Sequence, residues 1–292
     1  MRKILITGAN SYIGTSFEAW VTREQFRGEY EVNTLDMMDV KWKQHDFSQY
    51  DVVFHVAGIA HADIKNVTEE VKQKYYTVNT ELAIETAQHA KAVGVRQFIF
   101  MSSIIVFGDS SKNGYYRISK DTQPNPANFY GDSKLQADIG LHKLQTDDFH
   151  VVSLRPPMIY GKGSKGNYPR LAKLAKKLPF FPSYRNERSM LHIDNLCECI
   201  RLIIDDEASG IFYPQNREYV CTAQLVKAIR EQAGRKMHLV GVLNPFVKLA
   251  VRCSGTAGKV FGTMVYEKDM SDYKDFAYCV NGFEESVRKT EG

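Results

Sequence analysis

Short apolar runs alternate with amphipathic stretches along the first half of the chain. Runs with the length and composition of buried strands cover residues 3–7, 31–36, 51–58, 97–101 and 151–154. Between them apolar residues recur at helical spacing, most clearly over residues 67–93, which end at the helix-stopping Gly94. Strands that alternate with helices are joined by right-handed crossovers into one parallel sheet. The pattern therefore predicts an α/β fold with a doubly wound parallel sheet, whose ligand crevice lies at the carboxyl ends of the strands.

The regular alternation stops after residue 156. The next segments are a basic stretch with two glycines and a serine over residues 162–170, an amphipathic helix over 171–178 and a proline-containing loop over 179–187. A chain of 292 residues is long enough for a large domain that carries a smaller lobe. We expect one domain over residues 1–156 and a small C-terminal lobe over residues 157–292, of which residues 191–219 return to the sheet.

The composition mainly excludes other classes of protein. The net charge is +4 and no long basic run is present, which argues against a nucleic-acid partner. The five cysteines lack the spacing of a zinc site, so we expect reduced thiols, no metal and a cytoplasmic protein. No apolar run approaches the roughly 20 residues that span a bilayer, and the chain begins with a strand rather than a signal sequence. We therefore expect no stable membrane insertion.

A glycine loop connects the first strand to the first helix. Gly8 and Gly14 hold the first and last glycine positions of a Gly-x-x-Gly-x-x-Gly pattern, and Ser11 holds the middle one. In such loops the first glycine makes the tight turn, the middle one admits a pyrophosphate and the last packs helix on strand. A serine adds a β-carbon and a hydroxyl donor, so we expect dinucleotide binding with an altered phosphate position. The alternative is a strand-to-helix turn without a ligand.

The second strand ends in an acid, Asp36, 22 residues after Gly14. An acid at this separation suits the 2′-hydroxyl of NAD and repels the 2′-phosphate of NADP. The alternative is an acid in a surface loop, and Asp39 lies nearby. We expect residues 1–156 to form an NAD-binding domain of the Rossmann type. His55 in the third strand is interpreted as a core histidine rather than a catalyst.

Tyr130 and Lys134 stand four residues apart in a segment with a helical pattern, so they share one helix face. A free tyrosine has a pKa of about 10, and a nearby lysine cation favours the phenolate and lowers that pKa. Lowering the pKa to about 7 takes about 4 kcal/mol. By itself the pair is also typical of a solvated helix surface. Its weight comes from its surroundings, because Ser103 follows the strand over residues 97–101.

Together these motifs resemble the extended short-chain dehydrogenase/reductase family of nucleotide-sugar epimerases, dehydratases and reductases. The resemblance covers nearly the whole chain, and its motifs are residues 7–14, Asp36, Ser103 ahead of residues 106–108, residues 130–134, and residues 155–157 ahead of residues 160–161. It implies a Tyr130 acid/base, a Ser103 hydrogen bond to the substrate oxygen, and a Lys134 that holds the ribose hydroxyls and lowers the pKa of Tyr130.

The resemblance also implies binding residues. The expected cofactor contacts are Gly8, Ser11, Tyr12, Ile13, Gly14, Asp36, Asp46, Phe47, Val56, Ala57, Gly58, Asn79, Tyr130, Lys134 and Pro157. Besides Ser103, the expected substrate contacts are Arg188, which matches an arginine that binds the sugar-nucleotide diphosphate, and Asn167, whose alternative is a solvated loop role. Phe107 stands where the family usually has tyrosine.

The residues at two positions reduce the number of reactions that this chain can catalyse. Ile104 and Ile105 stand where the sugar dehydratases of the family carry acids, and neither side chain exchanges a proton, which argues against dehydration and decarboxylation. Redox at one carbinol carbon remains. We expect an NAD-dependent 4-epimerase of UDP-hexose or UDP-N-acetylhexosamine, of the kind found in bacterial surface-polysaccharide pathways. The alternatives are an NAD(P)H-dependent 4-keto reductase and a non-catalytic dinucleotide-binding sensor.

A stripe of alanines and a basic helix each allow two interpretations. Ala83, Ala87 and Ala90 form a stripe of small residues. The resemblance implies a homodimer through the helix that carries them, although the stripe suits packing on the chain's own sheet equally well. The basic helix over residues 171–178, followed by Phe180 and Phe181, suits an anionic membrane and a lipid-linked substrate. The alternative is a lobe helix whose lysines lie in water.

Overall fold

The chain forms two compact units that are both discontinuous in sequence. The computed structural model describes residues 1–60, 67–108 and 114–292. Unit 1 comprises Met1–Val106, Pro124–Arg155 and Cys197–Phe212, and unit 2 comprises Phe107–Gln123, Pro156–Leu196 and Tyr213–Gly292. Residues 107–123, which the sequence analysis assigns to the first domain, thus cluster with unit 2. Residues 197–212 are the part of the later sequence that returns to the first unit.

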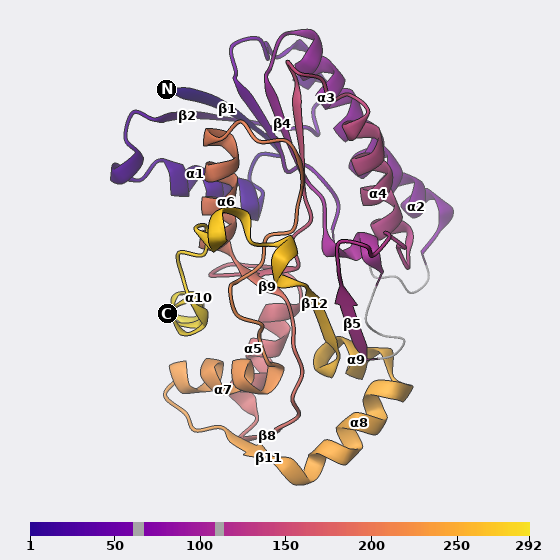
Figure 1. The fold of residues 1–292 in the computed structure, drawn as a ribbon, viewed down its shortest axis with the longest axis vertical. Helices are drawn as coiled ribbons and strands as arrows, with labels where there is room; N and C mark the ends of the chain where they lie inside the picture. Colours follow the sequence, from indigo (N-terminus) through magenta and orange to yellow (C-terminus); the bar gives the residue numbers. More distant parts are fainter. Residues whose placement is uncertain (61–66, 109–113) are drawn as a thin grey trace. The chain divides into compact units, whose positions relative to one another are not determined.

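Unit 1 is built on a six-stranded sheet in which every strand pair is parallel. Its strands are β1 (Arg2–Thr7), β2 (Tyr30–Leu35), β3 (Val52–His55), β4 (Gln97–Met101), β6 (His150–Leu154) and β10 (Gly210–Phe212). The spatial order is β10-β6-β4-β3-β1-β2, so the winding direction reverses beside β1. Figure 1 labels β2, β1 and β4 of this sheet. The predicted doubly wound parallel sheet is confirmed. Ligands of such sheets bind at the carboxyl ends of the strands near this reversal.

The helices of unit 1 are α1 (Tyr12–Val21), α2 (Glu69–Tyr76), α3 (Leu82–Ala92), α4 (Phe129–His142) and the part of α6 (Ile193–Asp205) that lies within the unit. Short 3-10 helices are η1 (Glu24–Phe26), η2 (Val40–Gln44) and η4 (Ile104–Phe107). The helix predicted over residues 67–93 begins at Glu69 and is interrupted by one π-helical turn, η3 (Thr77–Glu81).

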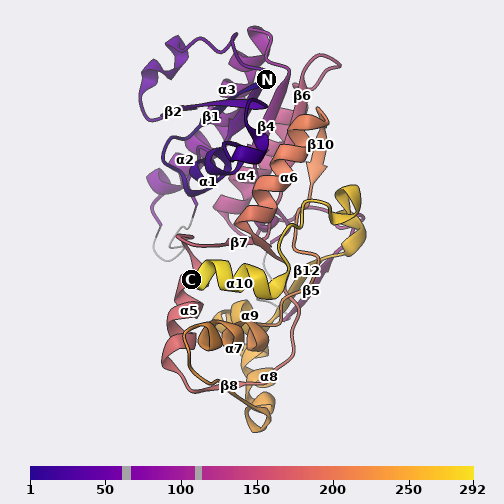
Figure 2. The same cartoon turned by 90° about the vertical axis from the view of Figure 1, so that its left-hand side faces the viewer.

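The small-residue stripe of α3 packs inside unit 1. Ala83, Ala87 and Ala90 are fully buried and belong to one core cluster with Phe98 and Phe100 of β4. α3 also lies beside α4 in both views (Figure 2). Packing on the chain's own sheet is therefore the correct interpretation of the stripe. The homodimer stays a prediction without support from these alanines.

In the part of unit 2 that the structure describes, the strands form three two-stranded parallel pairs. The pairs are β5 (Tyr115–Ile118) with β12 (Thr263–Tyr266), β7 (Met158–Tyr160) with β9 (Met190–His192), and β8 (Phe180–Pro182) with β11 (His238–Val240). Its helices are α5 (Asn167–Lys177), α7 (Thr222–Gln232), α8 (Asn244–Cys253), α9 (Gly255–Phe261) and α10 (Phe283–Glu291), with 3-10 helices η6 (Gly241–Leu243), η7 (Lys268–Met270) and η8 (Tyr273–Phe276). Within residues 1–60, 67–108 and 114–292, no helix combines the length and apolarity needed to cross a bilayer.

Candidate active site

The glycine loop makes a tight turn at the carboxyl end of β1. Gly8 has a φ of +106°, and a Cβ there would lie 2.7 Å from the backbone nitrogen of Ala57, which follows β3. Glycine is thus required both by the backbone conformation and by the close passage of the neighbouring chain. The Gly8 amide also donates to the carbonyl of Leu35, at 2.9 Å. The ends of β1, β2 and β3 are in this way held together around the loop.

Ser11 caps the helix that follows the loop. Its Oγ accepts a hydrogen bond from the Gly14 amide at 3.2 Å, and its extended backbone is that of a helix N-cap. Tyr12 and Ile13, two further predicted cofactor contacts, are the first residues of α1. The amides at a helix N-terminus suit a phosphate group. The middle position of the motif therefore has a clear local role in α1, and its contact with phosphate stays a prediction.

The structure distinguishes the two acids after β2. Asp36 is exposed directly after Leu35, the last residue of β2, and its Oδ1 accepts from the Met38 amide at 2.9 Å. The Oδ1 of Asp39 accepts from the Lys41 amide at 2.9 Å, where Asp39 caps the 3-10 helix η2. Because Asp36 stands at the strand end beside the glycine loop, it is the better placed of the two acids for a ribose.

Further predicted cofactor residues lie around the same strand ends. Val56 and Ala57 each donate a backbone hydrogen bond to the Thr7 carbonyl, at 3.0 and 2.9 Å, and Gly58 follows them. Asp46 accepts from the amide and hydroxyl of Ser48. The side chain of Phe47 is fully buried in the core of unit 1, so only its backbone is available to a cofactor.

Asn79 holds the backbone after β3 in place. It is fully buried in the π-helical turn, its Oδ1 accepts from the Ile59 amide at 2.8 Å, and its Nδ2 donates to the Ile59 carbonyl at 3.1 Å. The same Nδ2 donates to Ser133 Oγ of α4 at 3.1 Å. This one side chain therefore ties the chain after β3 to the helix that carries Tyr130 and Lys134.

Ser103, Tyr130 and Lys134 meet at the carboxyl end of β4. Asn128 caps α4 by accepting from the Gly131 amide at 3.0 Å. A Cβ on Gly131 would lie 2.8 Å from the Ile105 carbonyl oxygen, so glycine lets the start of α4 approach the segment after β4. Ser103 acts on the Tyr130 hydroxyl and lowers the pKa of this phenol.

Lys134 is buried one helical turn after Tyr130. Its Nζ donates to the carbonyl of Met101, the last residue of β4, at 2.8 Å, and lies 4.6 Å from the centroid of the Phe100 ring. Burial lowers the pKa of Lys134 to about 8, against the opposing effect of the Asp138 carboxylate.

The pKa of Tyr130 corrects one expectation. Burial raises the pKa of Tyr130 to about 12, and the hydrogen bond from Ser103 opposes this shift. The expected lowering of this pKa is therefore not seen in the protein alone, because loss of water around the phenol outweighs the opposing effect of Ser103. At neutral pH Tyr130 is a phenol, ready to donate a proton, and it needs further stabilisation of its phenolate to accept one.

A buried ion pair that follows Lys134 on α4 was not predicted from the sequence. Asp138 lies one turn further along α4, and its Oδ2 accepts from Ser102 Oγ at 2.8 Å and from Arg155 Nε at 2.9 Å. The spacing of four residues from Lys134 was the available signal. His55, in contrast, has the features of a core residue: it is fully buried, it shares a 2.8 Å hydrogen bond with Thr7, and burial lowers its pKa to about 3.

The remaining predicted residues belong to unit 2. Pro157 is buried directly before β7, and Asn167 is exposed as the first residue of α5. The Nη1 of Arg188 donates to the carbonyls of Lys259 and Gly262, at 2.9 and 3.3 Å, and so binds α9 and its C-terminal end. Contacts of these three residues with a cofactor or substrate stay predictions.

Comparison with known proteins identifies the family. Residues 4–216 match the model of the NAD dependent epimerase/dehydratase family. The chain belongs to this family. It is accordingly an enzyme of the epimerase/dehydratase class, and NAD is the cofactor of the family. The glycine turn, the amides of α1 and the exposed Asp36 fit a dinucleotide.

Two similar sequences are those of 4-epimerases, and one similar structure is that of a reductase with the same fold. UDP-glucose 4-epimerase of Vibrio cholerae is 30% identical over 78% of this chain and 75% of its own length. N-acetyl-α-D-glucosaminyl-diphospho-ditrans,octacis-undecaprenol 4-epimerase of Escherichia coli O157:H7 is 23% identical over 89% of this chain and 81% of its own. The crystal structure of a dTDP-4-dehydrorhamnose reductase from Clostridium acetobutylicum aligns over 99% of this chain and 98% of that chain, with a TM-score of 0.72 and 18% identity.

Proposed function

We propose that this enzyme is an NAD-dependent 4-epimerase of nucleotide sugars, with UDP-hexose or UDP-N-acetylhexosamine as substrate. The observation that carries the proposal is the group of Ser103, Tyr130 and Lys134 at the carboxyl end of β4, next to a glycine turn and an exposed acid. The similarity to the Vibrio cholerae UDP-glucose 4-epimerase supports the choice of reaction and of nucleotide. Ile104 and Ile105 in the acid positions of the dehydratases argue against dehydration.

The proposed roles follow from protonation states. A bound NAD, held by the glycine loop, Asp36 and Lys134, would supply hydride transfer to and from the sugar C4. Tyr130 takes the proton of the C4 hydroxyl during oxidation and returns a proton to the C4 oxygen during reduction. The Ser103 hydroxyl bonds the same oxygen. Lys134, protonated below a pKa of about 8, supplies the positive charge that the Tyr130 phenolate requires and binds the ribose hydroxyls.

In this mechanism the raised pKa of Tyr130 favours one half of the reaction over the other. A phenol with a pKa of about 12 suits the reductive half of the reaction, in which it donates its proton. The oxidative half needs the phenolate, and in this proposal the Lys134 cation is the side chain that stabilises it.

A 4-keto sugar reductase is the second candidate. The fold similarity to the Clostridium acetobutylicum dTDP-4-dehydrorhamnose reductase spans nearly the whole chain and gives this candidate its support. A reductase uses only the second half of the mechanism, so the same side chains serve both. Cofactor retention separates the two, because an epimerase regenerates its NAD in each cycle whereas a reductase must exchange its cofactor.

The test is to denature the purified protein, identify released nucleotides by mass spectrometry, and then incubate the native protein with UDP-glucose and UDP-N-acetylglucosamine. We expect NAD to be released and C4 epimers to appear without net change in NADH absorbance. Failure to change any UDP-hexose or UDP-N-acetylhexosamine at C4, together with oxidation of NADH or NADPH by a 4-keto sugar, would refute the epimerase and support the reductase.

A further inference from the structure

The helix α8 of unit 2 presents large apolar side chains to solvent. Val242, Phe246 and Leu249 expose 73%, 70% and 64% of their surface. Their spacing of four and three residues places them on one side of a continuous helical segment, since η6 runs directly into α8 through the helical backbone of Leu243 and Asn244. We call these three residues, with Lys248 and Arg252, the α8 face.

The opposite side of α8 is the side that packs against the rest of unit 2. Val247 and Val251 are buried, and α8 lies against α9 within unit 2 (Figure 1). The apolar residues of the α8 face are therefore additional to those that the fold needs. Exposed apolar residues that cluster on one side of a helix indicate an interaction surface.

The positive charge around the α8 face favours an anionic partner. Lys248 and Arg252 are exposed on α8 beside Leu249. Residues 232–266, which contain the helix, include five lysines and arginines and no acid, and residues 162–186 include seven and no acid. In the whole chain the basic and acidic residues are nearly balanced, at 38 and 34. The basic excess is therefore concentrated in these two segments of unit 2.

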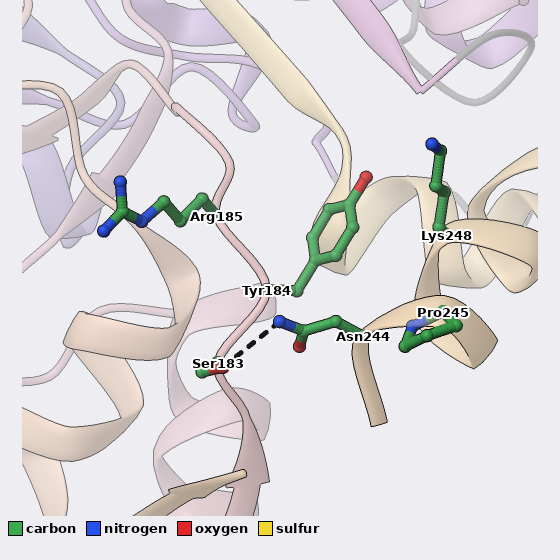
Figure 3. Close-up of a pocket in the computed structure, with 6 residues that line it drawn as sticks. All are labelled: Ser183, Tyr184, Arg185, Asn244, Pro245 and Lys248. Carbon is green, nitrogen blue, oxygen red and sulfur yellow. Dashed lines mark hydrogen bonds between the residues drawn. The ribbon is translucent and has the colours of Figure 1, made fainter. Parts of the chain in front are cut away.

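A pocket of about 730 Å³ adjoins the start of α8. It is lined by Ser183, Tyr184, Arg185, Asn244, Pro245 and Lys248. Figure 3 shows the Tyr184 hydroxyl and the Lys248 ammonium pointing to the same side, whereas Arg185 points away from both. Asn244 donates to Ser183 Oγ at 3.2 Å and fixes the start of α8 against this loop. The lining thus places the Tyr184 hydroxyl, and no carboxylate, beside Lys248 of the α8 face.

We propose that the α8 face docks this enzyme on an anionic phospholipid membrane. Apolar side chains beside lysine and arginine on one helix are the pattern of an interfacial helix that lies in the plane of the headgroups. Phe246, Leu249 and Val242 enter the boundary between headgroups and acyl chains, while Lys248 and Arg252 meet lipid phosphates. The inference concerns the surface alone and stands whether the reaction is an epimerisation or a reduction.

A second copy of the chain is a poorer partner for the same surface. A two-fold contact through the α8 face would bring Lys248 and Arg252 of both copies together. No acid from residues 232–266 would be present to compensate these charges. An anionic bilayer offers apolar burial and opposite charge at once, so it matches both properties of the face.

Flotation of the full-length protein with vesicles tests the proposal. We expect binding to vesicles that contain phosphatidylglycerol to exceed binding to pure phosphatidylcholine by about tenfold or more, and to weaken with added salt. Phe246→Ser with Leu249→Ser should reduce this binding about tenfold or more, and Lys248→Glu with Arg252→Glu should abolish the preference for the anionic lipid.

Matched variants control for surface apolarity and net charge. Val71→Ser with Val93→Ser removes two exposed apolar residues of unit 1, and Lys74→Glu with Lys143→Glu changes the charge by the same amount as the α8 pair. Both should bind vesicles as the unchanged protein does. The proposal is wrong if the unchanged protein does not float with anionic vesicles, or if Phe246→Ser with Leu249→Ser alters only the oligomeric state in sedimentation and leaves vesicle binding intact.

Discussion

Tyr130 is the residue on which the proposed chemistry depends most. Its ring lies 6.0 Å from that of Tyr75 in an edge contact, so Tyr130→Phe keeps the packing and removes only the hydroxyl. General acid/base groups contribute about 10²–10⁴-fold to turnover. We expect Tyr130→Phe to lose turnover by about that factor and to retain NAD, measured by the rate of C4 interconversion and by nucleotide release on denaturation. Unchanged turnover would remove Tyr130 from the mechanism.

The pKa of Lys134 predicts a limit on activity at high pH. Below a pKa of about 8 the side chain is a cation, and as pH rises through this value the charge that favours the Tyr130 phenolate disappears. We therefore expect kcat/KM to fall above about pH 8, because this parameter reports ionisation in the free enzyme.

The Asp138 carboxylate raises the pKa of Lys134, so Asp138→Asn should move this fall to lower pH. Asp132→Asn on the same helix is the control, since Asp132 accepts from the Tyr76 hydroxyl and should leave the profile unchanged. Circular dichroism and NAD content of both variants monitor folding, because Asp138 also pairs with buried Arg155. An identical profile in the unchanged protein and Asp138→Asn would contradict this role for Lys134.

At the residue scale, motif spacing was a good guide to position and a poor guide to energetics. It located Ser103, Tyr130 and Lys134, which the structure brings together at one strand end. It could not predict the direction of the Tyr130 pKa shift, since that shift depends on how much water the tertiary packing removes. Asp138 was missed because a single acid on a helix has many ordinary explanations.

At the scale of single elements, Ser11 in the glycine loop serves as the N-cap of α1. Loss of an N-cap hydroxyl to alanine costs about 1 kcal/mol, whereas glycine at the same position costs only a few tenths. We expect Ser11→Ala to lower the free energy of unfolding by about 1 kcal/mol and Ser11→Gly to lower it less. Denaturant unfolding of the three proteins measures the difference.

The same pair of variants tests the phosphate contact. If Ser11 serves only as a cap, both variants bind NAD as tightly as the unchanged protein, measured by calorimetry on protein freed of nucleotide. If the hydroxyl also bonds a phosphate, both lose affinity. Equal stability of all three proteins would contradict the capping role.

The helix from Glu69 to Ala92 shows what periodicity could not resolve. A continuous helical pattern predicts one helix, yet the structure inserts a π-helical turn at Thr77–Glu81. Such turns are frequent at functional sites. Here the turn contains Asn79, whose three hydrogen bonds hold Ile59 and Ser133. A local pattern does not encode this turn, because these bonds join residues far apart in sequence.

For the whole molecule, the alternation of strands and helices was sufficient to predict the parallel sheet, whereas the composition of the two units was not predictable. Strand β5 pairs with β12 in unit 2, and these strands lie almost 150 residues apart, at Tyr115–Ile118 and Thr263–Tyr266. Residues 107–123 therefore join unit 2 through a contact that has no sequence signature of its own. The exposed apolar residues of α8 were missed for a related reason: their burial or exposure is decided by packing.

Membrane docking and the proposed reaction together predict how the substrate carrier affects kinetics. The Escherichia coli relative is named for a sugar linked to a lipid diphosphate, and a docked enzyme would meet such a carrier at the membrane surface. Phe246 and Leu249 together contribute about 3 kcal/mol when both leave water. If the substrate is lipid-linked, Phe246→Ser with Leu249→Ser should lower kcat/KM on N-acetylglucosaminyl-diphospholipid in anionic vesicles by at least about tenfold.

The same variant should process UDP-N-acetylglucosamine in solution as the unchanged protein does, because Phe246 and Leu249 are exposed and are not among the expected cofactor or substrate contacts. A product assay of both substrates with both proteins gives the comparison. Equal losses on the two substrates would indicate damage to the active site rather than lost docking. A third outcome is an enzyme that binds vesicles but acts only on the soluble sugar. Its membrane docking would then not serve to reach a lipid-linked substrate.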